Sequence, residues 1–202
     1  MKTIHTFGDS HSMFGWKDVK NATIKINHIG PKLMHTFGKE KDALINLSNY
    51  SLGNGDKIIY CFGEIDCRCQ IHKFVSIDSS YEKIIDKLVD SYIEAIKNNM
   101  KYYNIEEVTT CVYCIVPPVK NVGKNNNQLY PFLGSDEERK KYHLYMNKKL
   151  KEYCDKNKIV FFDITNQYED ENNFLKLELS DMICHIKDPL GLEKTIEKLG
   201  FI

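Results

Sequence analysis

Five short apolar segments recur along the chain, and polar or amphipathic stretches separate them. The first ends at Gly8, and the others cover residues 22–29, 57–62, 108–116 and 159–164. Apolar and polar residues alternate in 22–29, whereas 57–62 is a compact apolar run typical of a strand buried on both faces. The pattern therefore predicts five β-strands.

Four of the intervening stretches have helical character. Helices are expected at 39–52, 78–103, 135–157 and 190–199. In the second, apolar residues recur at helical spacing from Ile84 to Ile96, and the third opens with Ser135 and three acidic residues, which suit a helix N-terminus. Residues 166–187 are expected to be irregular, and 119–135 form a long polar loop with an apolar tip at 129–133, either a substrate-facing flap or a disordered insertion.

Strands that alternate with helices predict right-handed crossovers, and hence a parallel sheet with helices on both faces. We therefore expect an α/β protein, a three-layer α/β/α sandwich, with residues 1–202 forming a single domain. Sites in such sheets lie outside the carboxyl ends of the strands. Residues that directly follow a predicted strand are thus the first candidates for function.

Charge and composition narrow the range of partners. The 28 Lys and Arg residues balance 28 Asp and Glu residues, so nothing favours nucleic acid or an anionic membrane as the main partner. No apolar run approaches the roughly 20 residues of a membrane span, and no signal peptide is evident, so a cytoplasmic protein is expected. The oligomeric state cannot be predicted from the sequence.

The chain has seven cysteines, an odd number, three of them in predicted strands, and they fit reduced intracellular thiols better than a disulfide framework. Cys111 and Cys114 have the C-x-x-C spacing, but they lie within a strand and lack a second ligand pair. We therefore predict neither a metal nor a cofactor.

The most informative turn follows the first strand, at Gly8-Asp9-Ser10-His11. A serine at the carboxyl end of a strand, beside unpaired backbone N–H groups, is a place for a nucleophile and an oxyanion. The simpler interpretation is an N-capping serine. By itself, the Gly-Asp-Ser motif does not decide between the two.

Further candidates share the same predicted edge of the sheet. They are Gly30, the segment from Gly63 to Arg68, and the C-terminal pair Asp181 and His185. In this order the motifs resemble the SGNH or GDSL family of hydrolases over nearly the whole chain. The resemblance implies a flavodoxin-like five-stranded parallel sheet, with Ser10 as nucleophile, His185 as base and Asp181 as the acid that orients it. It also implies that the N–H groups of Ser10 and Gly30 form the oxyanion hole.

Two departures from the family pattern bear on the site. The third block of the family reads Gly-x-Asn-Asp, but this chain has Gly63-Glu64-Ile65-Asp66, and Ile65 cannot donate a hydrogen bond from its side chain. Asp181 lies four residues before His185, whereas the family spacing is three. A bulged loop would restore Asp181, or a backbone carbonyl would orient the histidine instead.

Five more residues are assigned to the site loops or to substrate binding, namely Asp9, His11, Gly63, Glu64 and Asp66. Arg68 is a separate case, because the chain has only two arginines and one of them falls at this edge. A guanidinium could hold Asp66 or Glu64 through two hydrogen bonds or meet the substrate, and the alternative is an exposed surface cation.

The expected activity is that of a serine esterase acting on an O-acylated carbohydrate or another small hydroxylated ester. Three alternatives remain open: an O-acyltransferase with the same Ser-His site, a binding module of the same fold that has lost catalysis, and a phosphate binder that uses Gly8-Asp9-Ser10 as an anion loop. The distance between Ser10 and His185 is the observation that best separates them.

Overall fold

The computed structural model describes residues 2–120 and 128–202. Its strands are β1 (Thr3–Gly8), β2 (Thr23–His28), β3 (Lys57–Cys61), β4 (Thr109–Tyr113) and β5 (Val160–Phe162). They form one sheet in the order β2-β1-β3-β4-β5, and every neighbouring pair is parallel. This flavodoxin-like order confirms the predicted fold class, and it places the reversal of strand order at β1 and β3.

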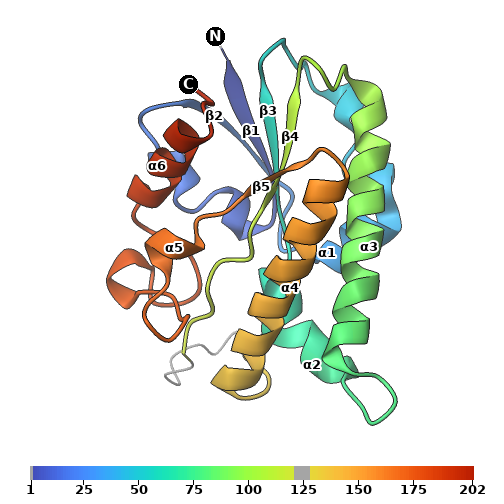
Figure 1. Cartoon of the computed structure of the whole chain (residues 1–202), viewed down its shortest axis with the longest axis vertical. Helices are drawn as coiled ribbons and strands as arrows, with labels where there is room; N and C mark the ends of the chain where they lie inside the picture. The colour runs from blue at the N-terminus through green and yellow to red at the C-terminus, as the bar shows by residue number, and fades with distance from the viewer. Residues whose placement is uncertain (1, 121–127) are drawn as a thin grey trace.

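Helices cover both faces of the sheet (Figure 1). They are α1 (Met34–Glu40), α2 (Ile71–Phe74), α3 (Tyr81–Asn99), α4 (Asp136–Lys156), α5 (Thr165–Tyr168) and α6 (Leu190–Lys198). In Figure 1, α1, α3 and α4 lie on one side of the sheet, and α5 and α6 lie on the other. The three layers that the alternating pattern predicts are therefore present.

Each face of the sheet has its own apolar core. Ile58 and Tyr60 of β3 pack with residues of α1, α3 and α4, whereas Ile59 and Cys61 pack with Trp16 and residues of α6. Successive side chains of a strand point to opposite faces, so a strand between two helical layers must be apolar throughout. This requirement explains the continuous apolar run at 57–62.

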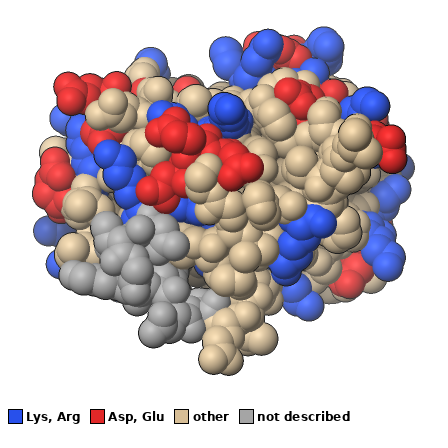
Figure 2. All heavy atoms as spheres, turned by 90° about the horizontal axis from the view of Figure 1, so that it is seen from below, with Lys and Arg blue, Asp and Glu red and all other residues tan. Residues whose placement is uncertain are grey.

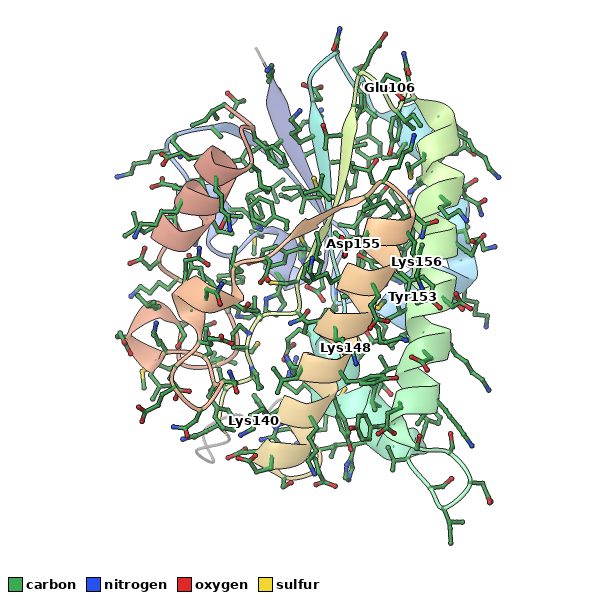
Figure 3. All side chains as sticks on the ribbon, in the orientation of Figure 1. Glu106, Lys140, Lys148, Tyr153, Asp155 and Lys156 are labelled. Carbon is green, nitrogen blue, oxygen red and sulfur yellow. The ribbon has the colours of Figure 1, made fainter. Side chains whose placement is uncertain are left out.

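The long helices carry the signals that the sequence contains. Ser135 caps α4 with a full capping box, in which its side chain accepts from the Glu138 N–H and the Glu138 side chain accepts from the Ser135 N–H. Cys154 faces the core, whereas Lys148 and Asp155 on the other side of α4 are exposed (Figure 3). The helix is thus amphipathic about the layer that it covers.

The prediction of a helix at 39–52 is wrong. Only the end of α1 falls in that range, because Lys41 adopts a φ of 49° and stops the helix. Two short 3-10 turns follow, and Asn46 caps the second by accepting from the Ser48 N–H. Ile45, between these turns, and Leu47, at the start of the second, are both buried, so apolar residues of this segment reach the core without a helix.

Candidate active site

Ser10 follows β1 in a turn that requires glycine at position 8, the last residue of the strand. A Cβ atom on Gly8 would lie 1.9 Å from the carbonyl oxygen of Cys61 in β3. Asp9 then closes the turn, because its Oδ1 accepts from the His11 N–H at 2.9 Å. The segment from Ser10 to Ser12 is a single 3-10 turn and not the start of a longer helix. Ser10 therefore sits at the strand edge, at the head of a tightly held loop.

The loop of residues 181–185 brings a histidine to this serine. His185 Nε2 lies 2.7 Å from Ser10 Oγ, and His185 Nδ1 lies 2.6 Å from Asp181 Oδ2. Since an ionised carboxylate only accepts, Nδ1 carries the proton, and Nε2 is left as the acceptor for the Ser10 hydroxyl. The structure thus brings Ser10, His185 and Asp181 together in one hydrogen-bonded line across 175 positions of sequence.

Asp181 reaches His185 in spite of the four-residue spacing because its second carboxylate oxygen, Oδ1, shapes the loop between them. Its Oδ1 accepts from the N–H groups of Ile183, Cys184 and His185 at 2.8, 3.0 and 2.9 Å, so the carboxylate folds its own loop. Burial alone would raise the pKa of Asp181, but the hydrogen bonds from His185 and these N–H groups outweigh it and hold the pKa well below its usual range. Asp181 is therefore ionised beside the imidazole.

A ring that the sequence analysis did not single out supports the histidine. Phe14 stacks on His185 with 4.2 Å between ring centroids and 20° between planes. Phe14 is four residues beyond Ser10, just after the 3-10 turn Ser10–Ser12, so the same loop supplies the serine and the ring that restricts the imidazole. No motif or spacing in the sequence marks this position.

Two backbone N–H groups in the loops after β1 and β2 have no partner among the described residues. Neither the Ser10 N–H nor the Gly30 N–H donates to any of the described residues. Gly30 has a φ of +89°, a conformation that favours glycine, and the space where a Cβ would stand is open. Such unpaired donors beside a nucleophile can receive an oxyanion.

The third-block segment does not place a side-chain donor at Ile65. That residue is only 3% exposed and packs in the core below the loop. Asp66 serves α1, because its carboxylate accepts from the N–H groups of Met34 and His35 at 2.7 and 3.3 Å. Burial raises the pKa of Asp66 to about 6 in spite of these bonds. The aspartate thus ties the Gly30 loop to the Gly63 loop.

Glu64 and Arg68 form a buried ion pair one helical turn apart. Glu64 Oε1 accepts from Arg68 Nε at 2.8 Å, and Glu64 Oε2 lies 3.6 Å from His11 Nε2. Burial would raise the pKa of Glu64, but Arg68 and His11 hold it well below its usual range. Burial lowers the pKa of His11, which Glu64 only partly offsets. A neutral His11 therefore lies beside an ionised Glu64, and the surface-cation interpretation of Arg68 is wrong.

Both arginines hold the described part of the long loop. Arg68 Nη1 donates to the Tyr130 carbonyl, and Arg139 Nη1 donates to the carbonyls of Leu133 and Gly134. Both guanidinium groups lie over the Phe132 ring, at 5.3 and 5.1 Å from its centroid. We call residues 128–134 the strap. Because the Tyr130 hydroxyl also donates to the Pro31 carbonyl, the strap joins the loops after β2 and β3. The asparagines at 125–127, part of the expected flap, lie outside the described residues.

One group of side chains near the Ser10–His185 pair has the composition of a metal site. Ligand atoms of His11, Cys184 and His185 lie within 4.8 Å of one another. Both nitrogens of His185 already face Asp181 and Ser10, and burial raises the pKa of the Cys184 thiol. The arrangement therefore favours proton transfer over metal binding. Cys111 and Cys114 are free buried thiols, and burial raises the pKa of each far above its usual range, so the reactive thiolate is disfavoured.

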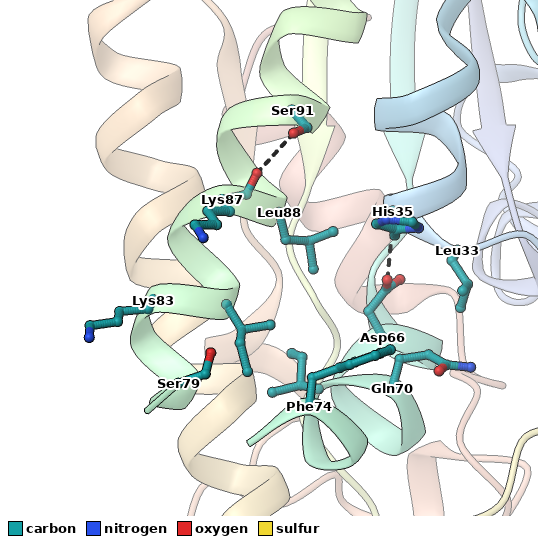
Figure 4. A pocket seen from close by; sticks show the side chains of 12 residues that line it. Leu33, His35, Asp66, Gln70, Phe74, Ser79, Lys83, Lys87, Leu88 and Ser91 are labelled. Carbon is teal, nitrogen blue, oxygen red and sulfur yellow. Dashed lines mark hydrogen bonds between the residues drawn. The ribbon is translucent and has the colours of Figure 1, made fainter. Parts of the chain in front are cut away.

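A pocket of about 460 Å³ lies beside the site and not in it (Figure 4). Leu33 at the N-cap of α1, Phe74 of α2 and Leu88 of α3 line it, and Asp66 forms part of its wall. Ser10 and His185 do not line this pocket. Lys83 and Lys87 are also in its lining, and the carboxyl of Asp66 is turned to the N–H groups of α1 (Figure 4).

The face at which the strands end has mixed charge (Figure 2). Acidic side chains gather in a central patch and recur near the edges, basic ones are scattered, and uncharged residues occupy a wide area between them. Among the described residues, no helix has the length and apolar character needed to cross a bilayer. The field on this face gives no reason to expect a polyanion.

Neither the family models nor the curated proteins contain a match to this chain. Solved structures do match. The chain is similar to a GDSL-like lipase from Bacteroides thetaiotaomicron, with a TM-score of 0.61 and 13% identity over 98% of this chain and 87% of that one. It is also similar to the aryl esterase of M. smegmatis, with a TM-score of 0.61 and 12% identity over 100% of both chains. A member of the lipolytic protein G-D-S-L family from Veillonella parvula matches with a TM-score of 0.56 and 10% identity over 98% of each chain. At these identities the likeness establishes the fold.

Proposed function

We propose that this chain, which has the fold of the GDSL lipolytic proteins, is a serine esterase. The observation that carries the proposal is the Ser10–His185–Asp181 line, with 2.7 Å from Oγ to Nε2 and 2.6 Å from Nδ1 to Oδ2. Both distances lie within hydrogen-bond range, and Asp181 fixes the tautomer in which Nε2 accepts. A structural histidine would not need this alignment with an edge serine.

The reaction follows from these positions. Ser10 Oγ attacks the ester carbonyl while His185 Nε2 takes the hydroxyl proton, and the charge on the carbonyl oxygen is received by the N–H groups of Ser10 and Gly30. The C–O bond to the alcohol then breaks, His185 returns the proton to the leaving oxygen, and an acyl-serine remains. Water, activated by the same nitrogen, releases the carboxylic acid and restores Ser10.

The substrate that fits best is an O-acylated carbohydrate or another small hydroxylated ester. The mixed charge of the site face and the tyrosine in the strap support a polar, neutral substrate more than a charged polymer. An O-acyltransferase would use the same groups, with a sugar hydroxyl in place of water. The anion-loop alternative loses support, because the turn after Gly8 is only three residues long.

The test is Ser10→Ala with a fluorophosphonate probe and a small acetyl ester. Wild-type protein should be labelled once and should hydrolyse the ester, whereas Ser10→Ala should lose labelling and roughly 10⁴-fold or more of kcat, with an unchanged melting temperature. A panel of acetylated sugars and long-chain p-nitrophenyl esters compares the substrate classes. Labelling of Ser10→Ala at the wild-type level would contradict the assignment.

A further inference from the structure

The oxyanion hole lacks the side-chain donor that the third block supplies in the resembling family, since Ile65 is apolar and buried. A guanidinium stands one turn further along the same loop. Arg68 belongs to the π-helical turn η5 (Asp66–Gln70), three residues after Ile65, and such turns are often found at functional sites. Arg68 therefore begins within one turn of the position that carries the third-block donor in that family.

The structure holds Arg68 rigidly and leaves one of its nitrogens unused. Nε donates to Glu64, Nη1 donates to the strap at Tyr130, and the guanidinium lies over Phe132. Nη2 makes no hydrogen bond with any described residue and is not among the enclosed polar atoms. Arg68 is thus buried, only 5% exposed, and keeps one N–H₂ group without a partner among the described residues.

Contacts connect this group to the reacting pair. Glu64 bridges Arg68 to His11, and the His11 ring lies 5.0 Å from the His185 ring, centroid to centroid. Arg68 also acts electrostatically on Cys184, the residue next to the base. Because the ionised Glu64 offsets its charge, Arg68 suits a fixed donor better than a site that attracts anionic substrates from solution.

We propose that Arg68 is a catalytic residue, whose Nη2 donates to the oxyanion in place of the third-block asparagine. During attack, the former carbonyl oxygen then receives three donors: the N–H groups of Ser10 and Gly30, and Arg68 Nη2. No proton is transferred to or from the guanidinium. The inference rests on the proposed esterase function and adds to it the group that completes the hole.

The donor must act in the transition state, so its removal should lower kcat and leave KM almost unchanged. Arg68→Met alone would leave Glu64 buried and unpaired, so the test uses Glu64→Gln as the baseline and compares it with Glu64→Gln/Arg68→Met. We expect a roughly 10²–10³-fold further loss of kcat on a small acetyl ester, with KM within about threefold. Affinity for a trifluoromethyl ketone, which forms a tetrahedral adduct with the serine, should fall by a similar factor.

Arg139→Lys is the matched control, since Arg139 is the other arginine that stacks on Phe132 and holds the strap. It should change kcat by less than about threefold.

The inference is overturned if the folded double variant keeps kcat within about threefold of Glu64→Gln, or if only KM rises. Melting temperatures establish that each variant is folded. These outcomes are distinct from a failure of the proposed function, which would appear as activity retained in Ser10→Ala. Activity lost in Ser10→Ala and kept in Glu64→Gln/Arg68→Met removes Arg68 alone.

Discussion

Replacing Asp181 with asparagine tests how the imidazole is held. The asparagine oxygen can still accept from the N–H groups of Ile183, Cys184 and His185, which keeps the loop folded. Its NH₂ group then faces His185 Nδ1, where the carboxylate oxygen stood at 2.6 Å. Two donors cannot face each other, so Nδ1 must lose its proton and Nε2 must carry it. In that tautomer Nε2 cannot accept the Ser10 proton.

The expected loss of kcat is large because the wrong tautomer predominates. The described residues offer Nδ1 no backbone carbonyl within hydrogen-bond distance that could restore the orientation. We expect a roughly 10³–10⁴-fold decrease in kcat, equal to about 4–5.5 kcal/mol of transition-state stabilisation. The melting temperature should change little, whereas Asp181→Ala should both inactivate the enzyme and loosen the loop.

Hydrolysis of a small acetyl ester gives the rate, and ¹⁵N NMR of the imidazole reports the tautomer directly. Wild type should have the proton on Nδ1, and Asp181→Asn should have it on Nε2. A variant with the tautomer switched but with kcat within tenfold of wild type would refute the assignment of His185 as the base. A variant with both tautomer and rate unchanged would refute the orienting role of Asp181.

Two further predictions concern the loops around the site. The pKa of Asp66 is raised to about 6, so the folded state binds this proton more tightly than the unfolded chain. The protonated Asp66 makes its full contribution to the free energy of unfolding below the unfolded-state pKa near 4. This contribution, about 3 kcal/mol in total, is lost as the pH rises through about 6. Urea unfolding at pH 4 and pH 8 should therefore show a smaller fall of the unfolding free energy in Asp66→Asn than in wild type, and parallel profiles would contradict the burial argument. In Gly63→Ala, the new Cβ would meet Ile115 Cδ1 at 2.5 Å and Met34 Cε at 2.7 Å at a φ of +114°, so we expect a loss of roughly 1–3 kcal/mol in thermal or urea unfolding, and wild-type stability would be the opposing result.

The strands could be predicted from the sequence because burial on both faces requires uninterrupted apolar runs, and β3 meets that requirement within one residue of the expected range. The start of α1 could not be predicted from the sequence. Its N-cap, Leu33, has no side-chain acceptor, and the role is filled by Asp66 from 32 positions away. Capping patterns are read locally, so a cap supplied by another loop leaves no local signal.

In the candidate site, too, some residues could be predicted from motifs and others could not. Ser10, Gly30 and His185 follow recognisable motifs, and the parallel sheet brings their segments to one edge. The function of the four-residue spacing depends on Asp181 using both oxygens, which no spacing rule expresses. Phe14 and the strap are likewise known only from three-dimensional contacts, because a stacked ring or a bonded carbonyl has no signature of its own in the chain.

The wide separation of Ser10 and His185 has a consequence for how competence is acquired during folding. Every strand of the sheet lies before residue 163, so the central scaffold can assemble with the serine in place and without its base. Only when the segment around 181–185 docks onto the edge does the hydroxyl gain a proton acceptor. The proposed nucleophile therefore depends on long-range closure, and a covalent serine probe would distinguish molecules in which residues 181–185 are docked from molecules in which only the sheet has formed.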